Sequence, residues 1–301
     1  LNHRVTGGGS AFLGGISRNF SSNLVLGRGR RLAVEADEFD RSFLRLWPDV
    51  AVVSSADADH LDIYGTAEAY RESFEKFTSL IRPDGCLLIK KGINVTPRLQ
   101  EGVKKYTYSV TEIADFYAEN IRICDGNITF DFVGPEIRIP DVELGVPVKV
   151  NIENGVAAMA IAWLNGVKPE DLKKGMATFA GPRRRFDFHL KTDQVVLIDD
   201  YAHHPTEIKV TLKAARQTQP KRLIVVFQPH RYTRTQLLLD EFAVAFKEAD
   251  ELIVTDIYAA SEDPIPGISG KMLAETIQRT TGQDVSYMSG FESIKNYLVD
   301  H

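Results

Sequence analysis

The sequence predicts an α/β protein of two domains, in which a central domain with a mostly parallel sheet and an antiparallel annex precedes a doubly wound, Rossmann-like domain. Short β-rich runs alternate with amphipathic helical segments, and this alternation is typical of parallel sheets. A hairpin signal interrupts the alternation near the middle of the chain, which predicts the antiparallel annex. A length of 301 residues also suits two domains of ordinary size.

The first domain begins with β-rich runs that suit fully buried strands of a parallel sheet. They are Arg31–Glu35 and Val50–Ser54, and a third strand is expected at Cys86–Lys90. Between the second and third strands, apolar residues recur at helical spacing from Tyr70 to Ile81. This part of the chain therefore predicts strand, helix and strand in succession.

The annex and a buried helix complete the first domain. Asn120–Cys124 and Ile128–Phe132 are rich in β-formers, and the Asp125-Gly126 pair between them is a hairpin signal. The Ala-rich segment Asn151–Asn165 then predicts a buried helix.

A second α/β region follows the Gly181-Pro182 pair, which we interpret as a hinge. The domains are therefore expected to span 1–181 and 182–301. Beyond the hinge, strands alternate with amphipathic helices, as in a doubly wound sheet. The strands are expected at Val195–Asp199, Leu223–Phe227 and Leu252–Thr255.

Composition excludes several classes of function. A formal net charge of −5 argues against a nucleic-acid partner, which needs a broad excess of Lys and Arg. No apolar run reaches the roughly 20 residues of a membrane-spanning helix, and no signal peptide is evident at the start. We therefore predict a cytoplasmic protein without a membrane partner. Cys86 and Cys124 lack CxxC spacing and are interpreted as reduced core residues.

Polar residues of the second domain follow its predicted strands, where open parallel sheets bind ligands. The polar strings are Asp199–Pro205, Gln228–Arg234, and Asp256–Tyr258 with Ser261–Asp263. Loops at strand ends are often polar only because they face water. Guanidinium groups pair bidentately with carboxylate or phosphate, however, so Arg231 and Arg234 favour an anionic substrate.

The first domain has a comparable set of polar residues. Glu35 ends one predicted strand, and the string Asp57–Asp62, which includes His60, ends the next. Carboxylate and imidazole together suit a divalent cation such as Mg²⁺. The alternative for His60 is a hydrogen-bonded structural histidine, since His is an uncommon ligand of Mg²⁺. Near the hinge, Arg183–Arg185 is either a solvated charge run or a set of cations for a phosphoryl group.

Four strings together resemble the Mur ligase family. They are Val34–Asp40, Asp57–Tyr64, Asp200–Glu207 and Gln228–Thr235, and the resemblance runs from about Ala11 to the end of the chain. It implies a central ATPase-type domain and a closing C-terminal domain. It also implies ATP and Mg²⁺ as cofactors, and the ligation of L-alanine to UDP-N-acetylmuramate through an acyl phosphate.

The resemblance also implies roles for individual residues in each domain. Glu35 and His60 resemble the Mg²⁺-binding pair, and Asn151 and Asn154 resemble residues around adenine. Arg184 resembles the arginine that faces the γ-phosphate, and Asp200 resembles the ribose contact. The residues that would position the substrate carboxylates are His203, Arg231 and Arg234, with Tyr201 beside them.

The chain departs from the family pattern in three respects. The glycine-rich phosphate loop and the UDP-binding domain, expected before Ala11, are absent, and so is the last strand, expected after His301. Val150 occupies a position where the family usually has His. The chain is therefore expected to be a fragment that is inactive by itself.

Three alternative functions remain open from the sequence. One is a ligase that attaches a whole peptide to UDP-N-acetylmuramate in cell-wall recycling. Another is a non-catalytic module that binds nucleotide or substrate. The third is a metal-dependent phosphohydrolase built on His60, His203 and neighbouring carboxylates.

Overall fold

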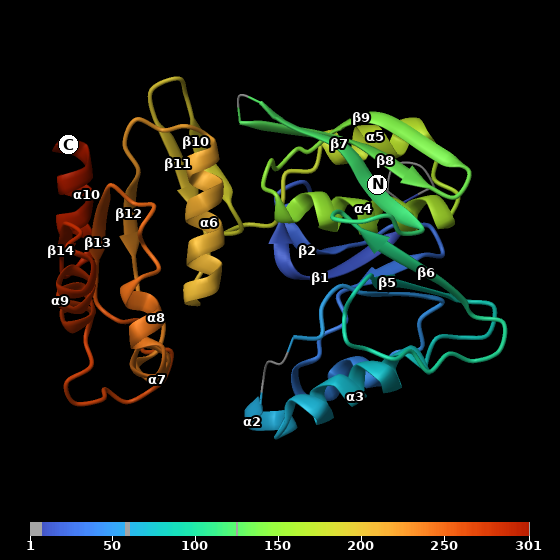
Figure 1. Cartoon of the computed structure of the whole chain (residues 1–301), viewed down its shortest axis with the longest axis horizontal. Coiled ribbons are helices and arrows are strands. Elements are labelled where there is room, and N and C mark those ends of the chain that lie inside the picture. Colours follow the sequence, from blue (N-terminus) through green and yellow to red (C-terminus); the bar gives the residue numbers. More distant parts are fainter. Residues whose placement is uncertain (1–7, 58–60, 125, 301) are drawn as a thin grey trace. The chain divides into compact units, whose positions relative to one another are not determined.

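The chain folds into two compact units, residues 1–183 and 184–301 (Figure 1). The computed structural model describes residues 8–57, 61–124 and 126–300, and of residues 61 and 62 it describes only the backbone. The boundary expected after residue 181 lies close to the division between the units.

A six-stranded sheet forms the centre of the first unit, with the strand order β4-β5-β6-β7-β8-β9. Neighbouring strands from β4 to β7 are parallel, whereas β7, β8 and β9 pair antiparallel. The predicted parallel sheet with an antiparallel annex is thus confirmed, and the annex continues the same sheet. The strands are β4 (Val50–Val53), β5 (Cys86–Lys90), β6 (Lys104–Ser109), β7 (Phe116–Cys124), β8 (Asn127–Gly134) and β9 (Ile137–Glu143).

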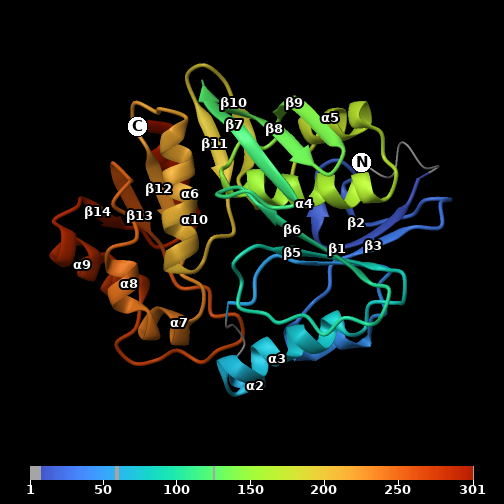
Figure 2. The ribbon, with the colours of Figure 1, turned by 45° about the vertical axis from the view of Figure 1, so that its right-hand side comes forward.

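Helices cover both faces of this sheet. Leu87 and Ile89 of β5 pack into one apolar cluster with α3 (Ala67–Thr78), while Leu88 packs into another with α4 (Val150–Leu164). Successive side chains of a strand point to opposite faces, so α3 and α4 lie on opposite sides. Figure 2 shows α4 together with α5 (Pro169–Ala177) against the strands of the annex.

A separate three-stranded sheet consists of β1 (Ser10–Ser17), β2 (Ser22–Val25) and β3 (Leu32–Val34). β1 pairs antiparallel with β2 and parallel with β3. The prediction of a buried strand at Arg31–Glu35 was therefore wrong about burial, because every residue of β3 is exposed. An apolar run indicates a strand, but it does not say which sheet the strand joins or what covers it. Two short helices, η1 (Phe39–Arg45) and α2 (Leu61–Tyr64), flank β4 in the sequence.

The second unit contains a parallel sheet with helices on both faces, so the predicted doubly wound fold is confirmed. Leu252 and Val254 of the central strand join an apolar cluster with residues of α6, α9 and the α8 region, whereas Glu251 interacts with Tyr297 of α10 on the other face. The strands are β12 (Ile224–Phe227), β13 (Glu251–Val254) and β14 (Val285–Tyr287). The helices are α6 (Pro205–Gln217), α7 (Tyr232–Leu237), α8 (Leu239–Ala243), α9 (Gly270–Thr281) and α10 (Phe291–Asp300).

The first predicted strand of this unit pairs differently from the prediction. β11 (Val196–Asp199) forms an antiparallel hairpin with β10 (Asp187–Lys191), and in the described part of the chain it has no ladder with β12. Neither β10 nor β14 is predicted from the sequence. Both are short, and β10 lies between the hinge and β11, where strand propensity alone gives a weak signal.

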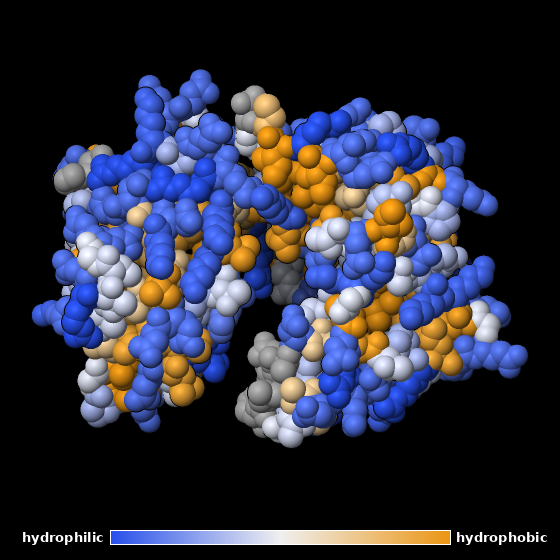
Figure 3. Space-filling model, in the orientation of Figure 1, coloured by the Kyte–Doolittle hydropathy of each residue, from blue (hydrophilic) through white to orange (hydrophobic). Residues whose placement is uncertain are grey.

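No helix among the described residues is long and apolar enough to cross a membrane. Hydrophilic and hydrophobic residues are interspersed on the visible surface of each unit in Figure 3.

Candidate functional site in the second unit

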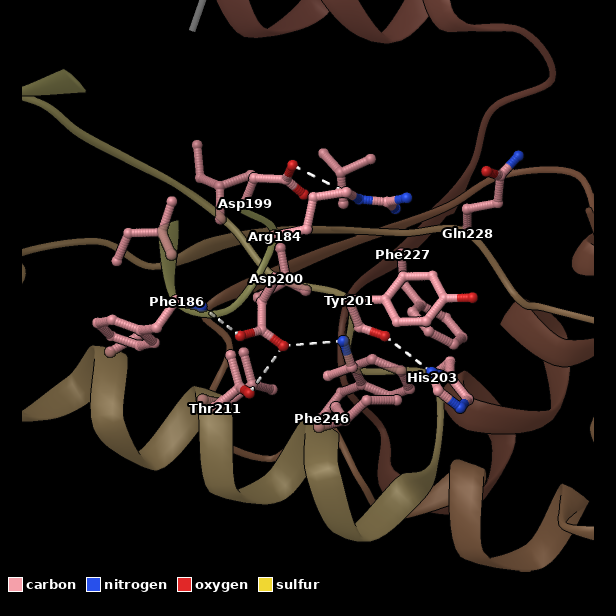
Figure 4. A pocket seen from close by; sticks show the side chains of 18 of the residues that line it. Arg184, Phe186, Asp199, Asp200, Tyr201, His203, Thr211, Phe227, Gln228 and Phe246 are labelled. Carbon is pink, nitrogen blue, oxygen red and sulfur yellow. Dashed lines mark hydrogen bonds and ion pairs between the residues drawn. The ribbon is translucent and has the colours of Figure 1, made fainter. Parts of the chain in front are cut away.

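A cavity of about 730 Å³ in the second unit is lined by residues of both β11 and β12 (Figure 4). Its apolar wall includes Val196, Phe227 and Phe246. Its polar lining residues come largely from the strings that follow the strands, where the sequence predicted the site. They are Arg184, Asp199, Asp200, Tyr201, His203, Thr211, Gln228, His230 and Tyr258.

Asp200 ties three parts of the cavity wall together. Its Oδ2 accepts a hydrogen bond of 2.7 Å from the backbone N–H of Phe186. Its Oδ1 accepts from the Ala202 N–H at 2.8 Å and from the Thr211 hydroxyl at 3.2 Å (Figure 4). Asp200 thus stabilises the turn from which Tyr201 and the residues after it extend.

Arg184 lies against Tyr201 at the edge of the same cavity. The guanidinium carbon is 4.8 Å from the centre of the Tyr201 ring, a cation–π contact, and the Tyr201 N–H donates to the Arg184 carbonyl at 2.7 Å. The Nε atom of Arg184 is 3.7 Å from Oδ2 of Asp199. The arginine is therefore oriented by two neighbours, while 59% of its side chain stays exposed to solvent.

His203 is held by the residues that start α6. Glu207 accepts hydrogen bonds from the backbone N–H groups of His203 and His204, at 3.0 and 3.2 Å, and His204 caps the helix. Burial would raise the pKa of Glu207, but these N–H groups and the nearby His203 ring outweigh burial and lower that pKa. The His203 Nδ1 lies 2.9 Å from the Tyr201 carbonyl oxygen. Because a carbonyl only accepts, Nδ1 carries a proton, and Nε2 is left as the acceptor of the neutral ring.

The sequence predicts no role for His230, although this residue directly precedes Arg231 in the polar string Gln228–Arg234. Its ring lies 5.7 Å from that of His203 and stacks on Tyr258 at 5.5 Å. Its Nδ1 is 3.0 Å from a guanidinium nitrogen of Arg234, which only donates, so Nδ1 is the acceptor. Burial, followed by repulsion from Arg234, holds the pKa of His230 below its ordinary 6.5.

Arg231 and Arg234 lie beside the cavity and are absent from its lining. Arg231 has a φ of 72°, the left-handed region, and directly precedes α7. Arg234 lies within α7, so the polar string Gln228–Arg234 is not one loop: the chain turns into a helix at Tyr232. Arg234 is linked to the cavity through His230.

The predicted Mg²⁺ ligands belong to the first unit. The Glu35 carboxylate follows β3 and accepts a hydrogen bond of 2.7 Å from the N–H of Gly14 in β1. A Cβ atom at Gly14 would lie 2.7 Å from this carboxylate, so a larger residue there would displace the Glu35 side chain from its present position. His60 lies outside the described residues. Among the residues that are described, no three His, Cys, Asp or Glu side chains form a cluster that could hold a metal ion. A carboxylate oxygen still suits Mg²⁺, which often takes one or two protein carboxylates and completes its shell with water and phosphate.

Asn151 and Asn154 are brought together at the start of α4. The side-chain amide of Asn154 donates to Oδ1 of Asn151 at 3.4 Å, and Asn151 donates to the Val146 carbonyl at 3.1 Å. Between them, Glu153 forms an ion pair of 2.9 Å with Lys90 at the end of β5. Val150, the first residue of the helix, is 51% exposed.

Two domain profiles of one family match this chain in succession. The Mur ligase middle domain matches residues 31–162, and the Mur ligase, glutamate ligase domain matches residues 184–300. The second match begins where the second unit begins.

Curated relatives and a solved structure agree with these matches. The UDP-N-acetylmuramate–L-alanine ligase of Parabacteroides distasonis is 74% identical over 270 residues, which are 89% of this chain and 58% of the relative. The ligase of the same name from Phocaeicola vulgatus is 53% identical over 92% of this chain and 61% of the relative. The crystal structure of the UDP-N-acetylmuramate–alanine ligase from Thermotoga maritima superposes with a TM-score of 0.80 and 25% identity, over 98% of this chain and 64% of that one.

This chain thus spans about three fifths of the length of the curated relatives, 58% and 61% in these two cases. The consecutive profiles and the high identity lead to one conclusion: the chain belongs to the Mur ligase family and contains its middle and glutamate ligase domains.

Proposed function

We propose that the complete protein joins L-alanine to the carboxylate of UDP-N-acetylmuramate in peptidoglycan synthesis, with ATP and Mg²⁺ as cofactors. The observation that carries the proposal is the cluster of Tyr201, His203 and His230 beside Arg231 and Arg234, in a chain 74% identical to a ligase of that activity. The cluster offers imidazole and guanidinium groups, a combination suited to an amino acid and a second carboxylate.

Amide formation from a carboxylate requires a leaving group, and in the proposed reaction ATP provides it by converting the carboxylate to an acyl phosphate. Bound Mg²⁺ would neutralise phosphate charge, and Glu35 and His60 are proposed to hold it. Arg184 is proposed to face the γ-phosphate, because Tyr201 and Asp199 orient its exposed guanidinium group.

The remaining polar residues have proposed roles in binding. Asn151 and Asn154 would contact adenine, and Asp200 would contact ribose while it maintains its three internal hydrogen bonds. His203 presents Nε2 as an acceptor, which suits a hydrogen bond from the ammonium group of alanine. A cytoplasmic location, predicted from the sequence, is part of the same proposal.

The direct test is an acceptor comparison with the complete protein. UDP-N-acetylmuramate, ATP and Mg²⁺ are supplied with L-alanine, with a cell-wall tripeptide, or with no acceptor, and phosphate and amide product are both measured. We expect amide product with L-alanine in proportion to the phosphate released. Product only with the tripeptide would favour the recycling ligase, and equal phosphate release without an acceptor would favour a phosphohydrolase.

A second test concerns the arginines. Lysine cannot reproduce the paired hydrogen bonds of a guanidinium group, so Arg231→Lys should raise the apparent KM for UDP-N-acetylmuramate or alanine by roughly tenfold and leave the KM for ATP nearly unchanged. Lys213→Arg, an exchange of the reverse kind on α6, serves as the control. A rise in the KM for ATP instead would assign Arg231 to the phosphate site.

A further inference from the structure

We propose that Glu262 is a positioning residue of the substrate site, because its carboxylate fixes the first turn of α7 and with it the side chains of Arg231 and Arg234. Glu262 belongs to the loop that follows β13, whereas α7 follows β12. In the sequence, Glu262 is one of several polar residues that follow the third predicted strand of the second domain.

The contact between the two loops is bidentate. Oε2 of Glu262 accepts the backbone N–H of Thr233 at 3.1 Å, and Oε1 accepts the Thr233 hydroxyl at 2.6 Å. The backbone of Tyr232 also donates to this carboxylate. Burial would raise the pKa of Glu262, but the Thr233 hydrogen bonds outweigh it and lower that pKa, so the group is ionised at neutral pH.

The first turn of α7 needs an external acceptor. The first N–H groups of a helix have no partner within the helix, and the side chain of Arg231 at the N-cap supplies none. α7 has only six residues, too few to be stable by propensity alone. Glu262 therefore provides, from another loop, the acceptor that a Ser or Asp side chain at the N-cap position normally provides.

Backbone contacts join the same two loops without satisfying the N–H groups of the first turn of α7. The Arg231 N–H donates to the Tyr258 carbonyl at 2.9 Å, and the Tyr258 N–H donates to the Pro229 carbonyl at 2.8 Å. The hydroxyl of the fully buried Thr235 donates to the Arg231 carbonyl at 2.8 Å. These bonds hold the left-handed backbone of Arg231, whereas the direction of the helix that carries Arg234 depends on its first turn and therefore on Glu262.

The kinetic part of this inference rests on the proposed function. In the complete protein, Glu262→Gln preserves the size of the side chain but replaces one acceptor oxygen by an N–H₂ group and removes the negative charge that strengthens both hydrogen bonds to Thr233. We expect the apparent KM for the carboxylate substrate held by the arginines to rise roughly three- to tenfold, while the KM for ATP stays nearly unchanged. Thr233→Val should have a similar effect, and the double variant should be no worse than the more severe single variant, because both remove the same contact.

Asp263→Asn is the matched control, since Asp263 is the exposed neighbour of Glu262 and removal of its charge should leave both KM values unchanged. An increase in both KM values together, or a lower melting temperature with unchanged kinetics, would show a general structural role and overturn the proposal.

Hydrogen exchange of the backbone separates this inference from the proposed function. In Glu262→Gln, a peptide covering residues 229–237 should exchange faster than in the unmodified protein or in Asp263→Asn. If the complete protein forms no alanine adduct but this peptide exchanges faster, the proposed function fails and the positioning role of Glu262 stands. If neither the exchange nor the KM values change in Glu262→Gln, the positioning role is refuted.

Discussion

At the scale of single residues, His230 has the best-defined environment in the site. Its ring lies between His203 and Tyr258 and accepts a hydrogen bond from Arg234. Burial is the largest cause of its lowered pKa, and the charges of Arg234, His203 and Arg231 lower the pKa further, against an opposing effect of Glu262. The ring is therefore neutral at pH 7, which keeps it available to accept and donate hydrogen bonds at once.

We expect Arg234→Met to raise the pKa of His230 towards 6.5 without reaching that value, because repulsion from the guanidinium disappears while burial remains. The pKa is measured by following the imidazole protons by NMR between about pH 4 and 8, a range that brackets the ordinary His pKa. Tyr258→Phe, which changes no charge, should leave the pKa nearly where it is. An unchanged pKa in Arg234→Met would mean that the charge of Arg234 does not contribute to the lowered pKa.

The lowered pKa of His230 also affects the stability of the folded protein. Since the folded pKa lies below the unfolded one, the unfolded state binds more protons near pH 6, and the folded protein loses stability as pH falls through 6.5 towards the folded pKa. In Arg234→Met, the pKa of His230 in the folded state is expected to be higher, so the protein should lose less stability as pH falls.

At the scale of elements, Asp131 of β8 connects irregularities in both neighbouring strands of the annex. The register between β7 and β8 shifts between Glu119 and Arg122, and Asn120 in that interval donates to Asp131 at 2.9 Å. The register between β8 and β9 also shifts, and the Asp141 N–H in β9 donates to Asp131 at 3.0 Å. Both Asn120 and Asp141 have positive φ, so one buried carboxylate holds two β-bulges.

Asp131→Asn should therefore destabilise the first unit at pH 7 by about 1–3 kcal/mol, because an amide N–H₂ then faces a donor. The hydrogen bond from Asn120 is the largest cause that holds the pKa of Asp131 below 3.8, followed by the Asp141 N–H. Stabilisation by a lowered carboxyl pKa is present above the unfolded pKa and is lost as pH falls through the folded pKa. The difference between the proteins should accordingly shrink on acidification below about pH 4.

Urea unfolding at pH 7 and pH 3, followed by tryptophan fluorescence, measures this difference. Glu143→Gln on the exposed face of β9 is the control and should have little effect at either pH. An Asp131→Asn protein as stable as the unmodified protein at pH 7 would contradict the role of the carboxylate in holding the bulges.

The sequence predicted the helices and strands themselves better than it predicted which strands pair with one another. Periodicity and turn chemistry predict β5, the hairpin of β7 and β8, and α4. β5 and α4 appear with nearly the expected bounds, whereas β7 begins at Phe116, earlier than the expected Asn120. The exposure of β3 and the pairing of β11 with β10 were missed, because sheet membership depends on contacts distant in sequence. Motif strings indicated His203, which lines the cavity, and Arg231 and Arg234, which lie beside it. The roles of His230 and Glu262 needed the structure, since their partners lie on other turns or loops.

At the scale of the whole molecule, each unit has apolar clusters of its own. Those of the first unit comprise residues from its six-stranded sheet and the packed helices, and the cluster around β13 lies entirely in the second unit. Each unit can therefore be perturbed separately. Both tryptophans of the chain, Trp47 and Trp163, belong to the first unit.

Leu273→Ala tests this separation. Leu273 is fully buried in the cluster of the second unit, and its truncation should destabilise that unit by about 2–5 kcal/mol. We expect the thermal transition seen by tryptophan fluorescence to stay in place, while circular dichroism shows an additional transition at lower temperature. The reciprocal variant Leu172→Ala, in the first unit, should shift the fluorescence transition. A fluorescence shift in Leu273→Ala would instead indicate that the two units unfold as one.

The open side of β12 bears on how the protein behaves at high concentration. β12 is an end strand of its sheet in the described part of the chain, so a row of backbone N–H and C=O groups can recruit a strand from another molecule, the first step of aggregation. The strand has only four residues, and the exposed cation Lys221 lies shortly before it. Short length and a nearby charge disfavour strand addition between molecules, so both features favour solubility.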